Sequence, residues 1–228
     1  MTEIEDNKEL LQLNDMEARI VGALMEKQLT TPDAYPLTLN SLVLACNQKT
    51  SREPITNLTN AQVQQTVNDL RERKIIDVEY GSRADRYDQK LSKHLFLDKQ
   101  QQALINIMLL RGPQTIGDLY SRTQRMTEFN SPEDIEERLQ TMCDKTSPIV
   151  IRIPRQSGQR EDRYMHVLSG AIDLSQLTLR APELKTVESS QAKSITESES
   201  NDSDLRALVQ KLEERVAVLE EKIEELLS

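Results

Sequence analysis

Arginine side chains are concentrated in two copies of one seven-residue phrase, and they are the residues of this chain best suited to bind phosphate. The phrase reads Gly-x-Arg-x-Asp-Arg-Tyr and occurs at residues 81–87 and again at 158–164, a spacing of 77 residues. A guanidinium group donates paired hydrogen bonds that match the oxygens of a phosphate. The candidate phosphate contacts in and beside the two copies are Arg83, Arg86, Arg155, Arg160 and Arg163.

Two interpretations of the phrase stay open at the level of sequence. In the structural one, each Gly permits a tight turn, each Asp pairs with a neighbouring Arg, and each Tyr covers the body of its domain. In the functional one, the exposed arginines follow a phosphate backbone or enter a minor groove. The structural interpretation accounts well for Gly, Asp and Tyr, but less well for the repeated Arg.

The helix predicted before each copy offers a sharper test of nucleic-acid binding. Residues 60–74 place Val63, Val67 and Leu70 on one apolar face, and the other faces are rich in amides. The candidate base and phosphate contacts on this helix are Gln62, Gln64, Gln65, Asn68 and Arg71. The equivalent helix at 131–144 is acidic, through Glu133, Asp134, Glu136, Glu137 and Asp144. DNA repels such a face, so we expect the first helix to read DNA and the second to bind protein or to leave DNA contact to its hairpin.

Each copy of the phrase closes a unit in which amphipathic helices precede a β-hairpin. Capping pairs such as Asn14 with Glu17 and Thr59 with Gln62 mark helix starts. The first unit is predicted to hold helices at 14–28, 39–46 and 60–74, and strands at 75–80 and 86–91. The second is predicted to hold helices at 99–111, 115–122 and 131–144, and strands at 149–153 and 163–168.

Three helices followed by a hairpin are the order of the winged-helix variant of the helix-turn-helix. We therefore expect a mainly α fold with small β-hairpins (α+β), built as two tandem winged-helix domains plus a C-terminal coiled-coil helix. The winged-helix domains are placed at residues 13–95 and 96–180, after a flexible N-terminus at 1–12. One continuous α+β domain is the alternative.

The C-terminal part of the chain has a different composition. Residues 181–203 include a stretch rich in Ser, Glu, Asp and Thr, which predicts a disordered linker. Residues 204–228 then space apolar side chains by four and three, the pattern of a parallel two-stranded coiled coil. The predicted homodimer contacts are Val209, Leu212, Val216, Leu219, Ile223 and Leu226. The alternative is a single helix folded back on its own domain.

Composition excludes several classes of protein. The net charge is −9, but residues 1–12 carry −3 of it and residues 185–228 carry −5, so the body between them is close to neutral. No apolar run is long enough for a membrane span and no export signal is seen, so we expect a cytoplasmic protein. The sequence shows no phosphate loop, metal-ligand cluster or nucleophile motif, and isolated His94, His166, Cys46 and Cys143 are interpreted as structural. We therefore expect no enzyme activity, no cofactor and no metal.

Several segments between residues 13 and 170 match, in order, the YceH-like family of bacterial proteins. They are 16–22, 26–27, 30–33, 35–37, 45–49, 70–73, 111–115 and 154–161. The chain thus resembles a member of that family, and the resemblance implies two winged-helix domains in tandem. The family is largely uncharacterised, so no catalytic or binding residue is carried over. One departure is Tyr164, where relatives often have Trp, a change that keeps an aromatic cover.

Together these patterns favour a DNA-binding or transcription-regulatory protein whose partner is double-stranded DNA. The alternative is a non-enzymatic adaptor that binds a protein partner through its winged-helix domains and coiled coil.

Overall fold

The computed structural model describes residues 12–169, which all belong to one compact unit. They form seven α-helices and two small antiparallel sheets, so the predicted α+β class is confirmed. Among these residues no helix has the length and apolarity that crossing a bilayer requires. The predicted linker, the coiled-coil helix and its homodimer contacts lie outside the described residues, as do residues 1–11 and 170–180.

The first repeat runs from α2 to β3 and begins as the sequence predicts. Asn14 Oδ1 accepts a hydrogen bond from Glu17 N at 2.9 Å, while Glu17 Oε2 accepts one from Asn14 N at 2.9 Å. This reciprocal cap satisfies two amides that a helix start leaves unpaired. The elements are α2 (Asp15–Thr30), η1 (Pro32–Ala34), β1 (Leu37–Thr38), α3 (Leu39–Cys46), α4 (Asn60–Glu72), β2 (Ile76–Glu79) and β3 (Arg86–Gln89).

The second repeat runs from α6 to β5 and follows a connecting turn of helix, α5 (Leu91–His94). Both α6 and α7 start with the same kind of reciprocal cap, made by Asp98 with Gln101 and by Thr115 with Asp118. The elements are α6 (Lys99–Arg111), α7 (Ile116–Thr123), α8 (Pro132–Cys143), β4 (Val150–Ile153) and β5 (Arg163–His166).

The two repeats use the same strand pairing around the Tyr of the phrase. In the first sheet the strand order is β1-β3-β2, and Tyr87 pairs with Leu37 on one side and Val78 on the other. In the second, Tyr164 pairs with Arg152 of β4 and forms an isolated bridge with Gln114. Both tyrosines are buried, which confirms that they cover the body of the protein.

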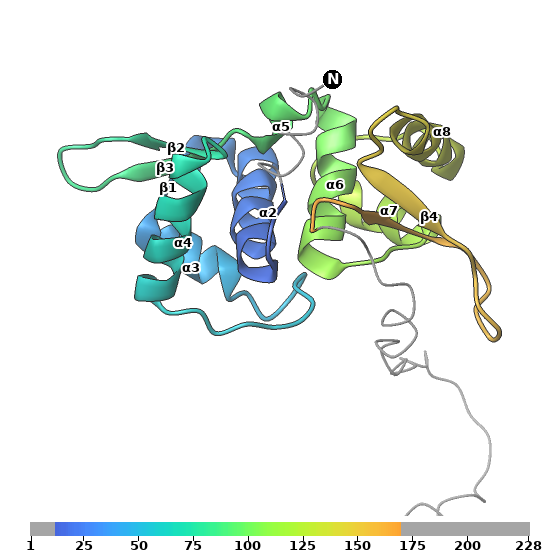
Figure 1. The fold of residues 1–228 in the computed structure, drawn as a ribbon, viewed down its shortest axis with the longest axis horizontal. Coiled ribbons are helices and arrows are strands. Elements are labelled where there is room, and N and C mark those ends of the chain that lie inside the picture. The colour runs from blue at the N-terminus through green and yellow to red at the C-terminus, as the bar shows by residue number, and fades with distance from the viewer. Residues whose placement is uncertain (1–11, 170–228) are drawn as a thin grey trace, which may run out of the picture. The chain divides into compact units, whose positions relative to one another are not determined.

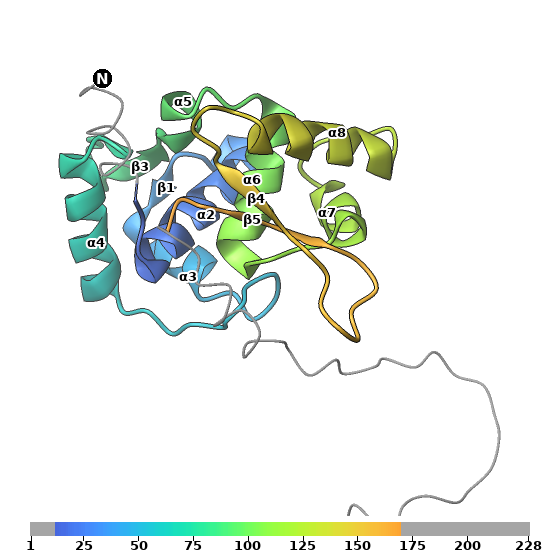
Figure 2. The same ribbon diagram turned by 45° about the vertical axis from the view of Figure 1, so that its right-hand side comes forward.

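The first helices of the two repeats, α2 and α6, lie side by side in the centre of the molecule (Figure 1, Figure 2). Ten consecutive residues of α2, Glu17–Glu26, and nine of α6, Gln102–Leu110, are buried. A Cβ on Gly22 would come within 2.9 Å of Leu110 Cδ2, so glycine permits this close approach. The repeats therefore share one continuous apolar core, and the domain boundary placed at residues 95 and 96 stays a prediction.

A buried ion pair ties the loop between α3 and α4 to α2. Arg52 Nη2 lies 2.6 Å from Glu26 Oε2, and Arg52 Nε donates to the carbonyl oxygen of Ala45 at 3.0 Å. Burial alone raises the pKa of Glu26, but the hydrogen bonds and charge of Arg52 outweigh it and hold that pKa below its usual value. Because removing one partner of such a pair leaves a buried charge, the pair fixes this loop firmly.

Candidate nucleic-acid interface

The helix α4 turns a polar surface to solvent because its apolar residues are all used in the core. Val63, Val67 and Leu70 are fully buried. At its start, Thr59 N and Thr59 Oγ1 both donate to Gln62 Oε1 at 2.9 Å. The exposed Gln62 is therefore part of the helix cap, and its side-chain oxygen is already engaged.

The other predicted contacts on α4 divide into two groups. Gln64 and Asn68 are half-buried and bonded to each other at 3.1 Å, and Gln64 Oε1 also accepts from Tyr87 Oη at 3.2 Å. This group joins the helix to its hairpin. Gln65 and Arg71 are exposed, and Gln65 Nε2 donates to Asp69 Oδ1 at 3.0 Å. They are the predicted contacts that a ligand on the outer face of α4 would meet directly.

The hairpin of β2 and β3 leaves from the end of α4 and projects away from the helices (Figure 1). Arg83 is exposed and makes no hydrogen bond or ion pair with any other residue in the range 12–169. Arg86 is also exposed, and its Nη1 donates to the carbonyl oxygen of Pro36 at 2.8 Å. One arginine is thus unengaged and the other is steadied by the turn before β1.

Two exposed groups near these residues were not among the sequence-predicted contacts. Tyr80 is 76% exposed, and its hydroxyl lies 3.5 Å from Arg71 Nη1, which links α4 to the base of the hairpin. Asn40 Oδ1 on α3 accepts from Asn60 Nδ2 at the start of α4, at 3.0 Å. Asn40 could have been found from the exposed face of α3, whereas the Tyr80 contact depends on the hairpin geometry.

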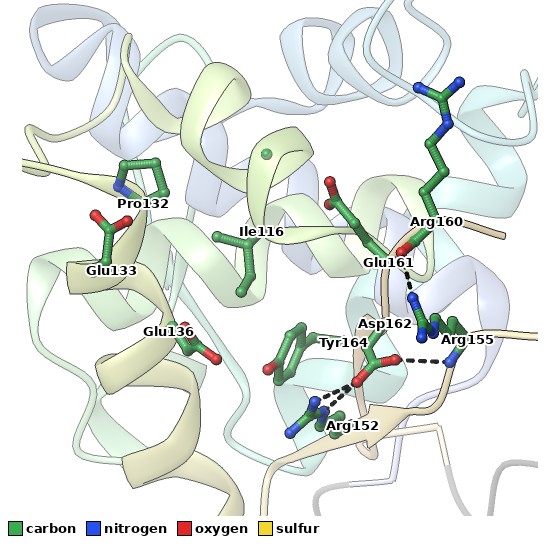
Figure 3. A pocket seen from close by; sticks show the side chains of 11 residues that line it. Ile116, Pro132, Glu133, Glu136, Arg152, Arg155, Arg160, Glu161, Asp162 and Tyr164 are labelled. Carbon is green, nitrogen blue, oxygen red and sulfur yellow. Dashed lines mark hydrogen bonds and ion pairs between the residues drawn. The ribbon is translucent and has the colours of Figure 1, made fainter.

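In the second repeat the same region is lined by both signs of charge. A hollow of about 660 Å³ lies between the starts of α7 and α8 and the β4–β5 hairpin (Figure 3). Glu133 and Glu136 line it from α8, and neither forms an ion pair among the described residues. On the hairpin side lies Asp162, which accepts from Arg152 Nε at 2.6 Å and from Arg155 N at 2.8 Å. The positive charge is therefore locally balanced.

The arginines predicted in the second copy consequently have different surroundings from those in the first. Arg155 Nη1 donates to the carbonyl oxygen of Arg160 at 3.3 Å, so its side chain lies along the hairpin. Arg160 is exposed and is among the residues that line the hollow (Figure 3), and Arg163 is half-buried. The backbone amide of Arg155 and the guanidinium of Arg152 lower the pKa of Asp162, which keeps this carboxylate charged beside them.

The comparison with known proteins places this chain in a family. Residues 13–159 match the family model described as "Protein of unknown function, DUF480". The chain belongs to the DUF480 family. This confirms the family resemblance drawn from the sequence, and the matched range covers both repeats up to the tip of the second hairpin.

Relatives of this DUF480 protein are similar along most of their length. A UPF0502 protein of Cellvibrio japonicus is 55% identical over 214 residues, covering 94% of this chain and 90% of the relative. A UPF0502 protein of Pseudomonas syringae pv. tomato is 45% identical over 214 residues, with 94% and 95% covered. A UPF0502 protein of Xanthomonas campestris pv. campestris is 40% identical over 214 residues, with 94% and 92% covered.

Proposed function

We propose that this protein is a non-enzymatic DNA-binding regulator built from two tandem winged helices. The element order α2-β1-α3-α4-β2-β3 with the sheet order β1-β3-β2, and a similar pairing around Tyr164, support the winged-helix interpretation. One observation carries the proposal. The exposed Gln65 and Arg71 of α4 adjoin a hairpin whose Arg83 and Arg86 are also exposed.

Each part of this surface has a distinct task on a duplex. An α-helix fits the major groove, where the amide of Gln65 is able to pair with the edge of an adenine. Arg83 and Arg86 contact phosphate oxygens, which sets affinity and position without reading sequence. The amides of Gln64 and Asn68 hold α4 and the hairpin in fixed relation, so that helix and wing meet the groove and the backbone together.

The predicted homodimer would present two such surfaces to one DNA molecule. Symmetric dimers of helix-turn-helix proteins bind half-sites about one helical turn apart. This part of the proposal rests on the heptad pattern at Val209, Leu212 and Val216 and beyond.

The proposal is tested by fluorescence anisotropy of a short mixed-sequence duplex at low and moderate salt. The Arg83→Ala/Arg86→Ala variant is expected to bind more weakly to every sequence, and the slope of log affinity against log salt should fall by about 2. Arg125→Ala is the matched control, since Arg125 is exposed but lies between α7 and α8. Absence of binding by the full chain to any duplex at low salt would contradict the proposal.

A second candidate function is that of a protein-binding adaptor, and the acidic α8 favours it. Glu133, Glu136 and Glu137 form a carboxylate surface that repels nucleic acid and attracts a basic partner. The adaptor is expected to retain a defined protein partner from nuclease-treated lysate, and reversal of these three charges should release it. A partner that stays bound to the charge-reversed variant would show that α8 is not the binding surface.

A further inference from the structure

A second hollow, of about 490 Å³, lies where the two repeats meet. Its walls come from the end of α2, the end of β3, α5 and the start of α6, and α5 is seen near one end of the α2–α6 pair in Figure 1. Small-molecule sites in proteins have volumes of this order and often lie between structural units. A ligand here would touch both repeats at once.

Three glutamine side chains in this hollow form a network whose orientation is fixed by the backbone. Ser92 N must donate, and it donates to Gln89 Oε1 at 3.1 Å, so the nitrogen of Gln89 is the atom that faces Gln28 Oε1 at 2.7 Å. Gln28 Oε1 also accepts from Gln102 Nε2 at 2.8 Å.

This network leaves one donor and one acceptor unused. Gln28 Nε2 and Gln102 Oε1 make no hydrogen bond to other residues in the described part of the chain. Gln102 is only 8% exposed and lines the hollow, so the hollow is the route by which a ligand reaches its oxygen. A ligand edge that carries both a donor and an acceptor would complete the network.

An aromatic side chain stands at the rim of the same hollow in an unfavourable backbone conformation. Phe96 has φ 52°, in the left-handed region, and it directly follows the residue that caps α5, where glycine is preferred. Phe96 is 89% exposed, so burial in the core does not offset the cost of this conformation. Lys74 follows the C-cap of α4 in the same conformation (φ 58°), so this geometry belongs to the helix end, and it is the exposed aromatic surface of Phe96 that suggests contact with a ligand.

The hollow also has a positively charged side chain at its edge. Lys93 on α5 lines the hollow, is exposed, and forms no ion pair with any residue between 12 and 169. An anionic group of a ligand could therefore pair with its ammonium group without displacing a carboxylate.

We propose that this hollow binds a mononucleotide, or a ligand of the same chemistry, at the joint between the repeats. The planar base stacks on Phe96 and pairs its edge with Gln28 Nε2 and Gln102 Oε1, and the phosphate pairs with Lys93. The site is separate from the α4 surface, and its occupancy does not depend on DNA binding.

Isothermal titration calorimetry of the full chain with AMP, GMP, CMP and UMP tests this site. One or more of them is expected to bind once per chain, and the matching nucleoside about tenfold more weakly because it lacks the phosphate. Lys93→Ala should lower nucleotide affinity to the level of the nucleoside and leave nucleoside binding unchanged. Lys49→Ala is the matched control, since Lys49 is exposed and lies outside the hollow.

A second variant separates loss of the site from loss of the fold. Phe96→Gly should raise the midpoint of thermal unfolding, because glycine tolerates the left-handed conformation, while nucleotide affinity falls about tenfold. The Arg83→Ala/Arg86→Ala variant should keep full nucleotide affinity, which distinguishes this site from the DNA surface. No saturable heat with any of the four nucleotides, or unchanged affinity in Phe96→Gly, would overturn the proposal.

Discussion

The two repeats share a sequence motif and a strand pairing, yet their third helices and hairpins present electrostatically different surfaces. In the first, Arg83 is unengaged and α4 exposes amides; in the second, Asp162 engages Arg152 while α8 exposes carboxylates. Backbone pairing around Tyr87 and Tyr164 is what the repeats keep in common. The two repeats thus share their strand pairing while their surfaces differ, and a repeated motif need not mean a repeated activity.

The glycines of the phrase illustrate the same divergence inside the hairpin. Gly158 has φ +88°, a conformation that glycine adopts without strain. Gly81 has no positive φ, but a Cβ there would come within 2.5 Å of the carbonyl oxygen of Ala84. Glycine is therefore required at these two positions for different physical reasons.

The largest effect is expected from the ion pair that the first repeat buries. Arg52→Met leaves the buried Glu26 dependent on the partly exposed Lys27, whose Nζ lies 3.3 Å from Glu26 Oε2, and should cost about 3 kcal/mol of unfolding free energy in urea titrations. Arg111→Met is the control, because its partner Glu53 has a half-exposed side chain and the pair contributes at most about 1 kcal/mol. Equal losses in the two variants would show that burial of the Glu26 pair is not decisive.

The buried histidine of the second repeat should produce the next largest effect, through pH. Burial lowers the pKa of His166 to about 4, whereas an unfolded chain takes up the proton near pH 6.5. Stability is therefore full above about pH 6.5 and is lost as pH falls towards 4, by up to about 3 kcal/mol.

Thermal unfolding between pH 7 and pH 4 measures this loss. His166→Asn should flatten the profile in this range, since it removes the titrating group. His94→Asn is the control, because His94 is exposed and its ring bonds to the carbonyl oxygen of Lys74 at the protein surface. A profile that keeps its slope in His166→Asn would assign the pH dependence to other groups.

A smaller effect is expected when α8 is made to resemble α4. Replacing Glu133, Glu136 and Glu137 with Gln removes three negative charges that face the hollow or its neighbouring surface. If the second repeat also lies near DNA, affinity at low salt should rise about tenfold and the gain should vanish at high salt. Unchanged anisotropy would mean that α8 faces away from DNA and that only the first repeat binds it.

The smallest effects concern the two glycines and separate their roles. Gly158→Ala should cost about 1 kcal/mol in unfolding free energy, and Gly81→Ala at least as much, because the backbone at Ala84 must shift. Asn tolerates the left-handed region, so Gly158→Asn should lose less than Gly158→Ala. Gly81→Asn should lose as much as Gly81→Ala, because its Cβ meets the same carbonyl oxygen. If Asn and Ala differed in the same way at both positions, the two glycines would not have separate roles.

Local signals were sufficient to predict the helices of both repeats. Caps such as Asn14 with Glu17 and Thr59 with Gln62 act within one turn, so the sequence alone places helix starts within a residue. The hairpin strands were predicted to within about two residues at either end, a usual error for strand limits. The two-residue β1 and the four-residue α5 were missed because neither is long enough to show a periodic pattern.

Contacts between distant segments could not be predicted. The packing of α2 on α6 depends on Gly22 meeting Leu110, and the pairing of Arg52 with Glu26 joins residues 26 positions apart. In the candidate site, the sequence pattern was sufficient to predict that Arg83 and Gln65 are exposed. It could not predict the hydrogen bond that Tyr87 donates to Gln64. The expectation that each Asp pairs with an Arg agrees with the structure for Asp162, whereas Asp85 makes no such pair among the described residues.

The close contact of α2 with α6 delays the folding of the first repeat while the chain is being synthesised. When the first repeat leaves the ribosome, the face of α2 around Gly22 has no partner until α6, about 80 residues later in the chain, has also emerged. During that interval the nascent chain exposes apolar surface that chaperones recognise. The first repeat therefore completes its folding only after the second has begun, and a truncated chain that ends after β3 would be prone to aggregate.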